Sequence, residues 1–349
     1  MGFGGANGAG KTNLLDAIYL LSTGKSYFNV QDKQLIRYEA TEYGVSGYFD
    51  GDDGENSAFQ VKCTFRDGRK QLKVNEKVYE RLVDHYGKIP LTLIAPQDTE
   101  LITGGGLERR KFVDGLIAQY NHTYLEDLMR YNRGLQQRNA LLKSEMNQRG
   151  QLPSEWLAPY DAQLSEHGSA IVRERKAFLE NFLPLFRENY AAIGHEDEKI
   201  DILYEPGADP GCRLEDLLKE RHSDDLRLKR TTVGPHRDDW RFLLHGRPVK
   251  KFGSQGQQKT YLLALKLTRH QLLAQQTQRM PILMLDDLFD RLDRQRIGRL
   301  LQWLKMANCG QVFFTDTDPE RLEDLAQTYK IPLEIWHIAA QSVSHIDKS

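Results

Sequence analysis

The sequence has few cysteines, no long apolar run and almost no net charge. Its three cysteines, Cys63, Cys212 and Cys309, are scattered and form no CxxC pair. A disulfide framework or structural zinc site is therefore not expected, and a reducing cytoplasm is the expected location. No run of about 18 apolar residues is present, so we expect no membrane-spanning helix. The first residues also lack the charged and apolar regions of a secretory signal.

The charge balance limits how this chain could bind nucleic acid. Its 48 Lys and Arg residues face 49 Asp and Glu residues, for a formal net charge of −1. Binding to a phosphate backbone would therefore need a local basic face, or one completed by a second subunit. The length of 349 residues and the 40% of hydrophobic residues fit a globular protein with two lobes.

The order of predicted elements indicates an α/β fold interrupted by a helical insertion. We expect strands at residues 45–50, 59–65, 69–74 and 89–95, with Asp67-Gly68 forming a type I′ hairpin turn. Apolar residues at helical spacing then predict two long helices, over 116–142 and 156–190, joined by a polar turn at 147–154. The simplest arrangement is an antiparallel helical hairpin, either a specialised arm or an ordinary part of the core.

Alternation of strands and helices returns in the last third of the chain. Predicted strands lie at 200–204, 240–244, 247–252, 282–287 and 311–315, and predicted helices at 214–221, 257–273 and 295–306. We therefore divide the chain into an N-terminal half of an α/β core (1–106), a helical lobe (107–195) and a C-terminal half of the core (196–349).

The first residues match the phosphate-binding loop pattern GxxxxGK[ST] in full. The candidate phosphate-binding residues are Gly5, Ala6, Asn7, Gly8, Ala9, Gly10, Lys11 and Thr12. The backbone N–H groups of such a loop converge on phosphate oxygens, Lys11 can reach the β and γ phosphates, and the Thr12 hydroxyl can bind Mg²⁺. The ordinary alternative is a glycine-rich start of a helix, because only a few residues precede the loop to form its strand.

A second motif is the apolar run at 282–287, which ends in Asp286 and Asp287. A strand of this kind places its last carboxylates at the carboxyl edge of the sheet, where ligands bind. Asp286 is the candidate Mg²⁺ ligand, and Asp287 is the candidate catalytic group that orients or deprotonates the attacking water. The alternative is that these acids only cap the next helix.

A third motif, Ser254-Gln255-Gly256-Gln257, opens a helix upstream of the acidic strand. This is the arrangement of the ABC-type ATPases, in which the serine, the glycine backbone and the helix N-terminus address the γ-phosphate of ATP held by another subunit. Two weaker candidates fit the same scheme. Gln97 ends a predicted strand and could contact Mg²⁺ and the attacking water, and Asp293 lies where such ATPases cross the dimer interface. A surface turn and a helix cap are their ordinary alternatives.

Together these motifs resemble the RecF recombination-mediator family over nearly the whole chain. The matching segments are 7–18, 96–98, 108–114, 234–239, 254–259 and 285–287. The Gly-Pro-His-Arg-Asp-Asp run at 234–239 is the most distinguishing, because ABC transporters lack it. The resemblance implies an α/β fold class, an ABC/SMC-type P-loop ATPase head with an inserted α-helical hairpin lobe.

The resemblance also implies a function. Family members bind ATP and Mg²⁺, dimerise with ATP, bind single- and double-stranded DNA at gaps or junctions, and hydrolyse ATP slowly with stimulation by DNA. They act with RecR and RecO to place RecA on DNA. Carried over to this chain, Ser254 and Gly256 would reach the nucleotide of the opposite subunit. Two alternatives stay open: the ATPase subunit of an ABC transporter, and an interaction protein that holds ATP without hydrolysing it.

The sequence departs from the family pattern in three places. Family members have a β-hairpin before the phosphate loop, so its absence here leads us to expect a truncated start. In the segment Ser26-Tyr27-Phe28, many family members have an arginine as the third residue, where this chain has Phe28. No histidine follows the strand at 311–315, so we expect Thr315 or Thr317 to take the position of the switch histidine.

Two basic clusters are candidate contacts for DNA phosphates. The candidate residues are Arg109, Arg110, Arg237, Lys250 and Lys251. Charged runs are more often only solvated surface. Within the 234–239 run, a metal site is not expected, because no further His or Cys lies at ligand spacing. We expect instead a Gly-Pro turn held by buried Arg–Asp pairing.

Overall fold

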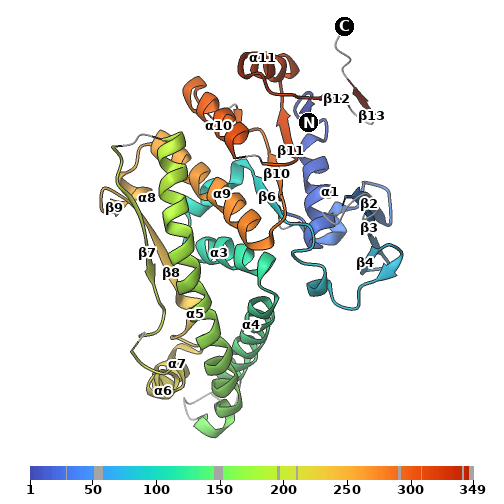
Figure 1. The fold of residues 1–349 in the computed structure, drawn as a ribbon. Coiled ribbons are helices and arrows are strands. Elements are labelled where there is room, and N and C mark those ends of the chain that lie inside the picture. The colour runs from blue at the N-terminus through green and yellow to red at the C-terminus, as the bar shows by residue number, and fades with distance from the viewer. Residues whose placement is uncertain are drawn as a thin grey trace. The chain divides into compact units, whose positions relative to one another are not determined.

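A mainly parallel sheet combines strands from both ends of the chain and forms the centre of one of the two packed units (Figure 1). Its strand order is β13-β12-β1-β11-β10-β6, and every neighbouring pair is parallel except β12 and β13. The strands are β1 (Gly2–Gly4), β6 (Leu91–Ile94), β10 (Ile282–Leu285), β11 (Val312–Asp316), β12 (Ile335–Ala339) and β13 (Ser342–His345). Parallel strands need crossovers: helix α10 (Arg294–Met306) joins β10 to β11, and helix α11 (Pro319–Tyr329) joins β11 to β12.

The computed structural model describes residues 1–28, 30–50, 58–144, 152–194, 197–209, 211–289, 292–307, 309–339 and 342–345. The chain packs into two units. Residues 1–98, 192–194 and 259–349 form unit 1, and residues 99–191 and 195–258 form unit 2. The predicted division at residues 106 and 195 separates consecutive segments of the sequence. The two packed units each combine several segments, so the division stays a prediction.

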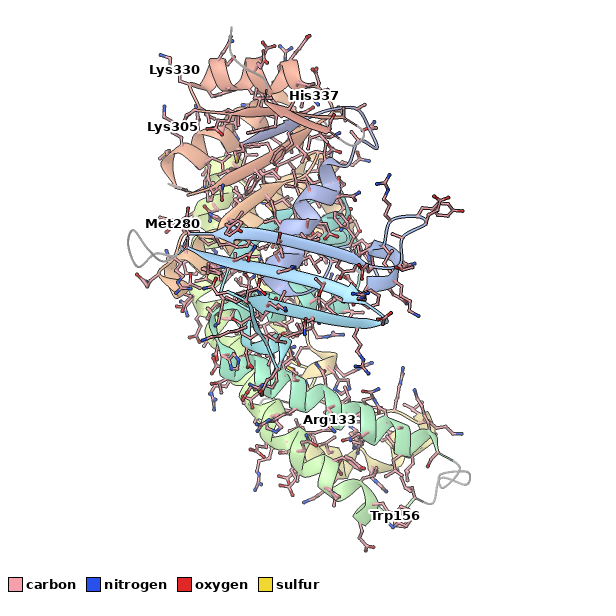
Figure 2. All side chains as sticks on the ribbon, turned by 90° about the vertical axis from the view of Figure 1, so that its right-hand side faces the viewer. Arg133, Trp156, Met280, Lys305, Lys330 and His337 are labelled. Atoms are coloured by element: carbon pink, nitrogen blue, oxygen red, sulfur yellow. The ribbon has the colours of Figure 1, made fainter. Side chains whose placement is uncertain are left out.

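Helix α1 (Lys11–Thr23) lies between the parallel sheet and a second, antiparallel sheet of unit 1. Leu15 packs against the parallel sheet, and Leu20 and Leu21 pack against the antiparallel one, so the helix is apolar on two faces. The strands of the second sheet are β2 (Tyr43–Phe49), β3 (Phe59–Arg66), β4 (Arg69–Val74) and β5 (Lys77–Val78), seen from the front in Figure 2. Asp67 and Gly68 have φ values of 50° and 74°, as the predicted type I′ turn requires.

Unit 2 is mainly helical, with a three-stranded antiparallel sheet. Its elements are α2 (Glu100–Thr103), α3 (Gly106–Tyr120), α4 (His122–Lys143), α5 (Ser154–Ile193), β7 (Ile200–Glu205), α6 (Leu214–Glu220), α7 (His222–Leu228), β8 (Asp239–Leu244), β9 (Arg247–Pro248) and α8 (Val249–Phe252). Helix α9 (Gln255–Thr277) follows and continues into the residues of unit 1. Of the helices described, none combines the length and the apolar character needed to cross a bilayer.

Helices α4 and α5 form the predicted antiparallel hairpin (Figure 1). Two side-chain pairs show that the helices are antiparallel. Asp127 of α4 bonds His167 of α5, and Arg138, which comes later in α4, donates to Asp161, which comes earlier in α5. The predicted first helix over 116–142 is wrong as a single element. The Asn121 side chain accepts from the N–H of Tyr124 and caps a new helix there. Residues 147–151 of the predicted polar turn lie outside the described residues.

The predicted strand at 247–252 is also wrong beyond its first two residues. The hairpin turn at His245-Gly246 is present, with φ values of 49° and 73°, but β9 ends at Pro248. Proline cannot donate to the ladder, and residues 249–252 form the short helix α8 instead.

A buried ionic cluster holds unit 2 together. The Arg175 side chain is only 2% exposed and donates to Asp114 at 2.8 Å and to Asp238 at 2.7 Å. It also donates to the carbonyl of Pro235 and lies over the Trp240 ring. The 234–239 run is therefore held by the buried Arg–Asp pairing that the sequence predicted. Buried charges stay in place only when every partner is present, since an unpaired one is costly.

We expect Arg175→Met to lower the free energy of unfolding by about 3–5 kcal/mol, because Asp114 and Asp238 would stay buried without a cation. Chemical denaturation of the variant measures this change. The control is Arg187→Met, since the ion pair of Arg187 with Asp201 is half-exposed and contributes at most about 1 kcal/mol. Equal effects in the two variants would contradict the importance of the buried cluster.

Candidate nucleotide-binding site

Four sequence motifs meet at the carboxyl edge of the parallel sheet. The phosphate loop follows β1, Asp286 and Asp287 follow β10, Thr315 lies near the end of β11, and Gln97 follows β6. Because these strands are parallel neighbours, their carboxyl ends face the same side. Ligands of open α/β sheets bind at this edge.

The loop between β1 and α1 has the conformation of a phosphate cradle. Gly8 and Gly10 have φ values of 80° and 105°, which residues other than glycine rarely adopt. No heavy atom lies within 4 Å of the place where a Cβ of either residue would be, so the loop faces open space. Gly10 also caps α1, whose first N–H groups need partners. The residues therefore fit a bound phosphate chain.

Lys11 is folded back over this loop. Its side chain is 4% exposed, and Nζ donates to the carbonyls of Gly5 at 2.7 Å and Ala6 at 3.1 Å. The Ala6 carbonyl also accepts from the N–H of Ala9 at 3.2 Å. Asn7 is exposed at the tip. The ammonium group is thus held at the loop, where an anion would be its natural counter-charge.

Hydroxyl groups from helix α1 and strand β11 fix the first carboxylate of the acidic pair. Thr12 Oγ1 donates to both oxygens of Asp286 at 3.1 Å, and Thr315 Oγ1 donates to Oδ1 at 2.8 Å. Asp286 is 3% exposed. A hydroxyl and a carboxylate in contact beside a phosphate cradle are the protein ligands that Mg²⁺ commonly takes. The predicted Mg²⁺ ligands are therefore adjacent.

The second carboxylate has an unusual backbone. Asp287 has φ 44°, in the left-handed region, and its N–H donates to Thr315 Oγ1 at 2.9 Å. Strained backbone of this kind persists where the surroundings hold it, and it is frequent at functional sites. Of the two threonines proposed for the position of the switch histidine, Thr315 makes these contacts with the acidic pair.

Gln97 is exposed in a loop that a buried triad anchors. Its neighbour Asp98 accepts from Lys266 of α9 at 2.7 Å, from the Tyr27 hydroxyl, and from the N–H of Ala95 at 2.8 Å. Lys266 also donates to the Tyr27 oxygen at 2.9 Å. Burial lowers the pKa of Lys266, although the nearby Asp98 opposes that shift. Sequence analysis missed this triad; the signal was a lone lysine within the buried apolar run 261–268.

Ser254 is exposed at the start of α9 in unit 2. Its Oγ accepts from the N–H of Gln257 at 3.2 Å, and its own N–H donates to Gln257 Oε1 at 2.8 Å. This reciprocal pattern is a capping box, which leaves the serine hydroxyl hydrogen available to another acceptor. Gln255 and Gly256 form the first residues of the helix.

Asp293 caps helix α10. Its carboxylate accepts from the N–H of Arg296 at 2.9 Å, and this bond holds the pKa of Asp293 below its usual value. The geometry fits the ordinary alternative of a helix cap, and a role at a dimer interface stays a prediction.

The predicted DNA-contacting residues differ in how far they are already engaged. Arg109 donates two bonds to Asp239, at 2.7 and 2.8 Å, and Arg110 donates to the carbonyl of Asp238 at 2.6 Å. Arg237, Lys250 and Lys251 are exposed, although Lys250 Nζ donates to the carbonyl of Gly104 at 3.3 Å. A phosphate would have to compete with the carboxylate of Asp239 for Arg109, but only with a neutral carbonyl for Lys250.

Comparisons with known proteins place the chain in a family. Residues 2–335 match the model of the RecF/RecN/SMC N terminal domain. A protein of Bacteroides thetaiotaomicron named DNA replication and repair protein RecF is 41% identical over 337 residues, 96% of this chain and 89% of that protein. The chain belongs to the RecF family. A RecF of Flavobacterium johnsoniae is also 41% identical, over 94% of this chain and 92% of its own length.

Solved structures agree with this RecF assignment. The structure of the recombination mediator protein RecF with ATP, in the RecFOR pathway, matches with a TM-score of 0.87 and 28% identity over 99% of this chain and 91% of that one. An Smc head domain from Pyrococcus furiosus, 16% identical, matches with a TM-score of 0.55 over 99% of this chain and 89% of that one, a likeness of fold alone. The predicted fold class, an ABC/SMC-type ATPase head with a helical hairpin, is confirmed. The relatives are named for DNA replication and repair, not for transport.

His236 lies in the 234–239 run that distinguishes the RecF family. Its Nδ1 accepts from the Tyr131 hydroxyl at 2.7 Å, and its Nε2–H donates to the Thr231 carbonyl at 3.1 Å, as in the neutral ring. Both nitrogens are thus used. Over the parts of the chain that are described, no group of three or more His, Cys, Asp or Glu could hold a metal ion. Burial lowers the pKa of His236 from 6.5 to about 4.

We expect His236 to make this protein less stable in acid. Between pH 6.5 and about 4, His236 is protonated in the unfolded chain but stays neutral in the folded protein. The free energy of unfolding therefore falls as the pH falls through this window. The difference in free energy of unfolding between the wild type and His236→Gln should shrink by on the order of 3 kcal/mol from pH 7 to pH 4. Urea denaturation at several pH values measures the gap, and a constant gap would contradict the low pKa.

Proposed function

We propose that this chain is an ATP-gated DNA-binding dimer of the RecF type, which acts in DNA replication, repair and recombination. The observation that supports it most is the meeting of Lys11, Thr12 and Asp286 at one sheet edge, beside a glycine loop that faces open space. The relative solved with ATP has the same fold over 99% of this chain. ATP and Mg²⁺ are therefore the cofactors we propose.

In this proposal each residue of the loop has a role. The glycine-rich backbone and the N-terminus of α1 accept the phosphate chain, and Lys11 turns from the loop carbonyls toward the β and γ phosphates. Thr12 and Asp286 hold Mg²⁺, Asp286 directly or through water. A bound Mg²⁺ offsets the negative charge of the phosphates and orients them.

Asp287 and Gln97 are the proposed catalytic pair. Asp287 orients or deprotonates the attacking water, and Gln97 contacts both this water and the metal. An aspartate is one methylene shorter than the glutamate that many transporters have, so its reach to the water is poorer. Slow hydrolysis suits a timer that holds the closed state rather than a fast motor.

In this proposal the exposed start of α9 forms the dimer contact. Ser254 offers its hydroxyl hydrogen, and Gly256 its backbone, to the γ-phosphate held by a second copy. Asp293 crosses the same interface. Two copies would then enclose two nucleotides, and hydrolysis would open the dimer.

DNA, RecO and RecR are the proposed partners. The relatives are named for DNA replication and repair, and the solved relative belongs to the RecFOR pathway. We propose binding of single- and double-stranded DNA at gaps or junctions, which helps to load RecA. Lys250, Lys251 and Arg237 supply the exposed phosphate contacts, and Arg109 and Arg110 are the remaining proposed contacts.

We expect opposite effects from two substitutions at the nucleotide site. Lys11→Ala removes the main phosphate contact and should abolish ATP-dependent dimers. Asp287→Asn keeps ATP binding, should slow hydrolysis by about 100-fold or more, and should trap the dimer. Light scattering with and without ATP measures the dimer, and phosphate release from radiolabelled ATP measures hydrolysis. Dimers that form without ATP in both variants would contradict the proposal.

The same phosphate-release assay separates the remaining alternative, an interaction protein that holds ATP without turnover. Our proposal predicts release that gapped DNA stimulates, and the alternative predicts none with or without DNA.

We expect Lys250→Ala/Lys251→Ala to weaken DNA binding uniformly across sequences. The slope of log affinity against log salt should fall by about 2, roughly one for each lost phosphate contact. Arg213→Ala/Lys219→Ala is a control of equal charge, because both residues lie at α6 and pair with Glu215. Binding of gapped DNA at several salt concentrations measures both. Equal slopes for the two double variants would place the basic face elsewhere.

A further inference from the structure

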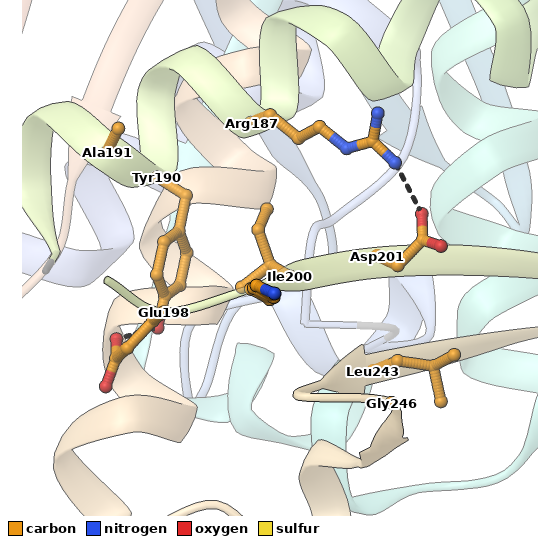
Figure 3. A pocket seen from close by; sticks show the side chains of 9 residues that line it. Arg187, Tyr190, Ala191, Glu198, Ile200, Asp201, Leu243 and Gly246 are labelled. Atoms are coloured by element: carbon orange, nitrogen blue, oxygen red, sulfur yellow. Dashed lines mark hydrogen bonds and ion pairs between the residues drawn. The ribbon is translucent and has the colours of Figure 1, made fainter. Parts of the chain in front are cut away.

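One carboxylate joins the start of α9 to the arm helix α5. Glu198, just before β7, accepts from Gln257 Nε2 at 2.7 Å and from the Tyr190 hydroxyl at 2.5 Å. Figure 3 shows Tyr190 reaching from α5 to Glu198, with the bond between them dashed. All three residues belong to unit 2. The two donors come from separate elements, so Glu198 fixes one relative to the other.

The bond to Gln257 decides how the Ser254 capping box is oriented. The Gln257 amide has an accepting end, which receives the Ser254 N–H at 2.8 Å, and a donating end, which points to Glu198. A flipped amide would set its oxygen against the carboxylate and its N–H₂ against the Ser254 N–H. Glu198 therefore selects the amide orientation that holds Ser254 in place.

The bond from Tyr190 connects Glu198, and through it the start of α9, to the buried face of helix α5. Tyr190 is 1% exposed, and its ring meets Phe186 edge to face with centroids 6.2 Å apart. Phe182 and Phe178 continue the stripe at four-residue spacing along one face of α5. Closely packed side chains of this kind move together rather than deform one by one.

A pocket of about 520 Å³ lies beside this network. Among its lining residues are Tyr190, Glu198, Ile200, Asp201 and Leu243. On the same strand as Ile200, Asp201 pairs with Arg187 of α5 at 3.0 Å (Figure 3). Asp201 is thus a second carboxylate in the same pocket, and it offers a matched comparison for Glu198.

We propose that Glu198 is a positioning residue for Ser254. Through the Gln257 amide it holds the Ser254 backbone in the position from which the serine hydroxyl meets a second copy's nucleotide, and through Tyr190 it makes that position depend on the end of α5. A displacement of the end of α5 would therefore withdraw Ser254 and loosen the dimer. This inference rests on the proposed ATP-dependent dimer and names a residue and a route that set its affinity.

The disrupting variant is Gln257→Glu. It keeps a capping-box acceptor for the Ser254 N–H but sets a second carboxylate against Glu198. We expect the dissociation constant of the dimer with a non-hydrolysable ATP analogue to rise about tenfold or more, because two facing carboxylates repel and a bond is lost. Binding of the analogue by the monomer should change by less than about twofold, since Glu198 and Gln257 lie outside the phosphate loop.

The rescue variant is Glu198→Gln/Gln257→Glu, which exchanges the two side chains. The glutamine at 198 accepts from Tyr190 and donates to the glutamate at 257, and the latter accepts from the Ser254 N–H. Every bond of the network is restored, and only the bond between positions 198 and 257 changes direction. We expect the dimer affinity to return to within about threefold of the wild type, a non-additive effect typical of residues in contact. Asp201→Asn is the control and should change the affinity by less than about twofold.

Amide hydrogen exchange in the first turn of α9, without nucleotide, gives an independent measurement. Exchange should be faster in Gln257→Glu and normal in the rescue variant. The inference is overturned if Gln257→Glu matches the wild type in both measurements, or if the double variant is no better than Gln257→Glu. If the wild type binds the analogue but forms no dimer, the proposed function fails, and the hydrogen exchange still decides whether Glu198 positions the Ser254 end.

Discussion

The nucleotide site depends on a contact between residues that are 274 positions apart, the hydrogen bonds from Thr12 to Asp286. That contact exists only because the three-residue strand β1 pairs with β11 and β12, and β11 pairs with β10. The close fit constrains the loop as well: a Cβ on Gly5 would lie 2.2 Å from the carbonyl oxygen of Ile338 in β12. The phosphate loop can thus begin at this sheet edge only with a glycine in that place.

The sequence predicts the residues of the site better than it predicts their surroundings. The phosphate loop and the acidic pair are local patterns with a stated chemistry, so Lys11, Thr12 and Asp286 could be named and are found together. The triad of Tyr27, Asp98 and Lys266 could not, because three separate segments form it and no sequence pattern links them. Strand β12 was also missed: four of its five residues are apolar, but the strand is short and is defined by its pairing with β1.

Boundaries within the helical part failed for physical reasons that a periodic pattern does not contain. The apolar stripe continues through Asn121, but the asparagine side chain bonds the N–H of Tyr124 and starts a new helix. Likewise, the alternation after Gly246 predicts a strand, whereas Pro248 removes the donor that a longer ladder would need. Local hydrogen-bonding groups thus override the periodicity at single positions.

Polar contacts, rather than apolar burial alone, fix the parts of this protein that must be placed accurately. Thr315 holds both aspartates of the acidic pair, Lys266 holds the loop that contains Gln97, and Glu198 holds the amide that orients Ser254. Apolar packing is non-directional and tolerates small shifts, but a hydrogen bond loses its value when its geometry changes. In the proposed dimer, which closes through such groups, a small movement of one of them would therefore loosen the closed state. Because Tyr190 at the end of α5 bonds one such group, Glu198, our proposal makes α5 the element through which that state is controlled.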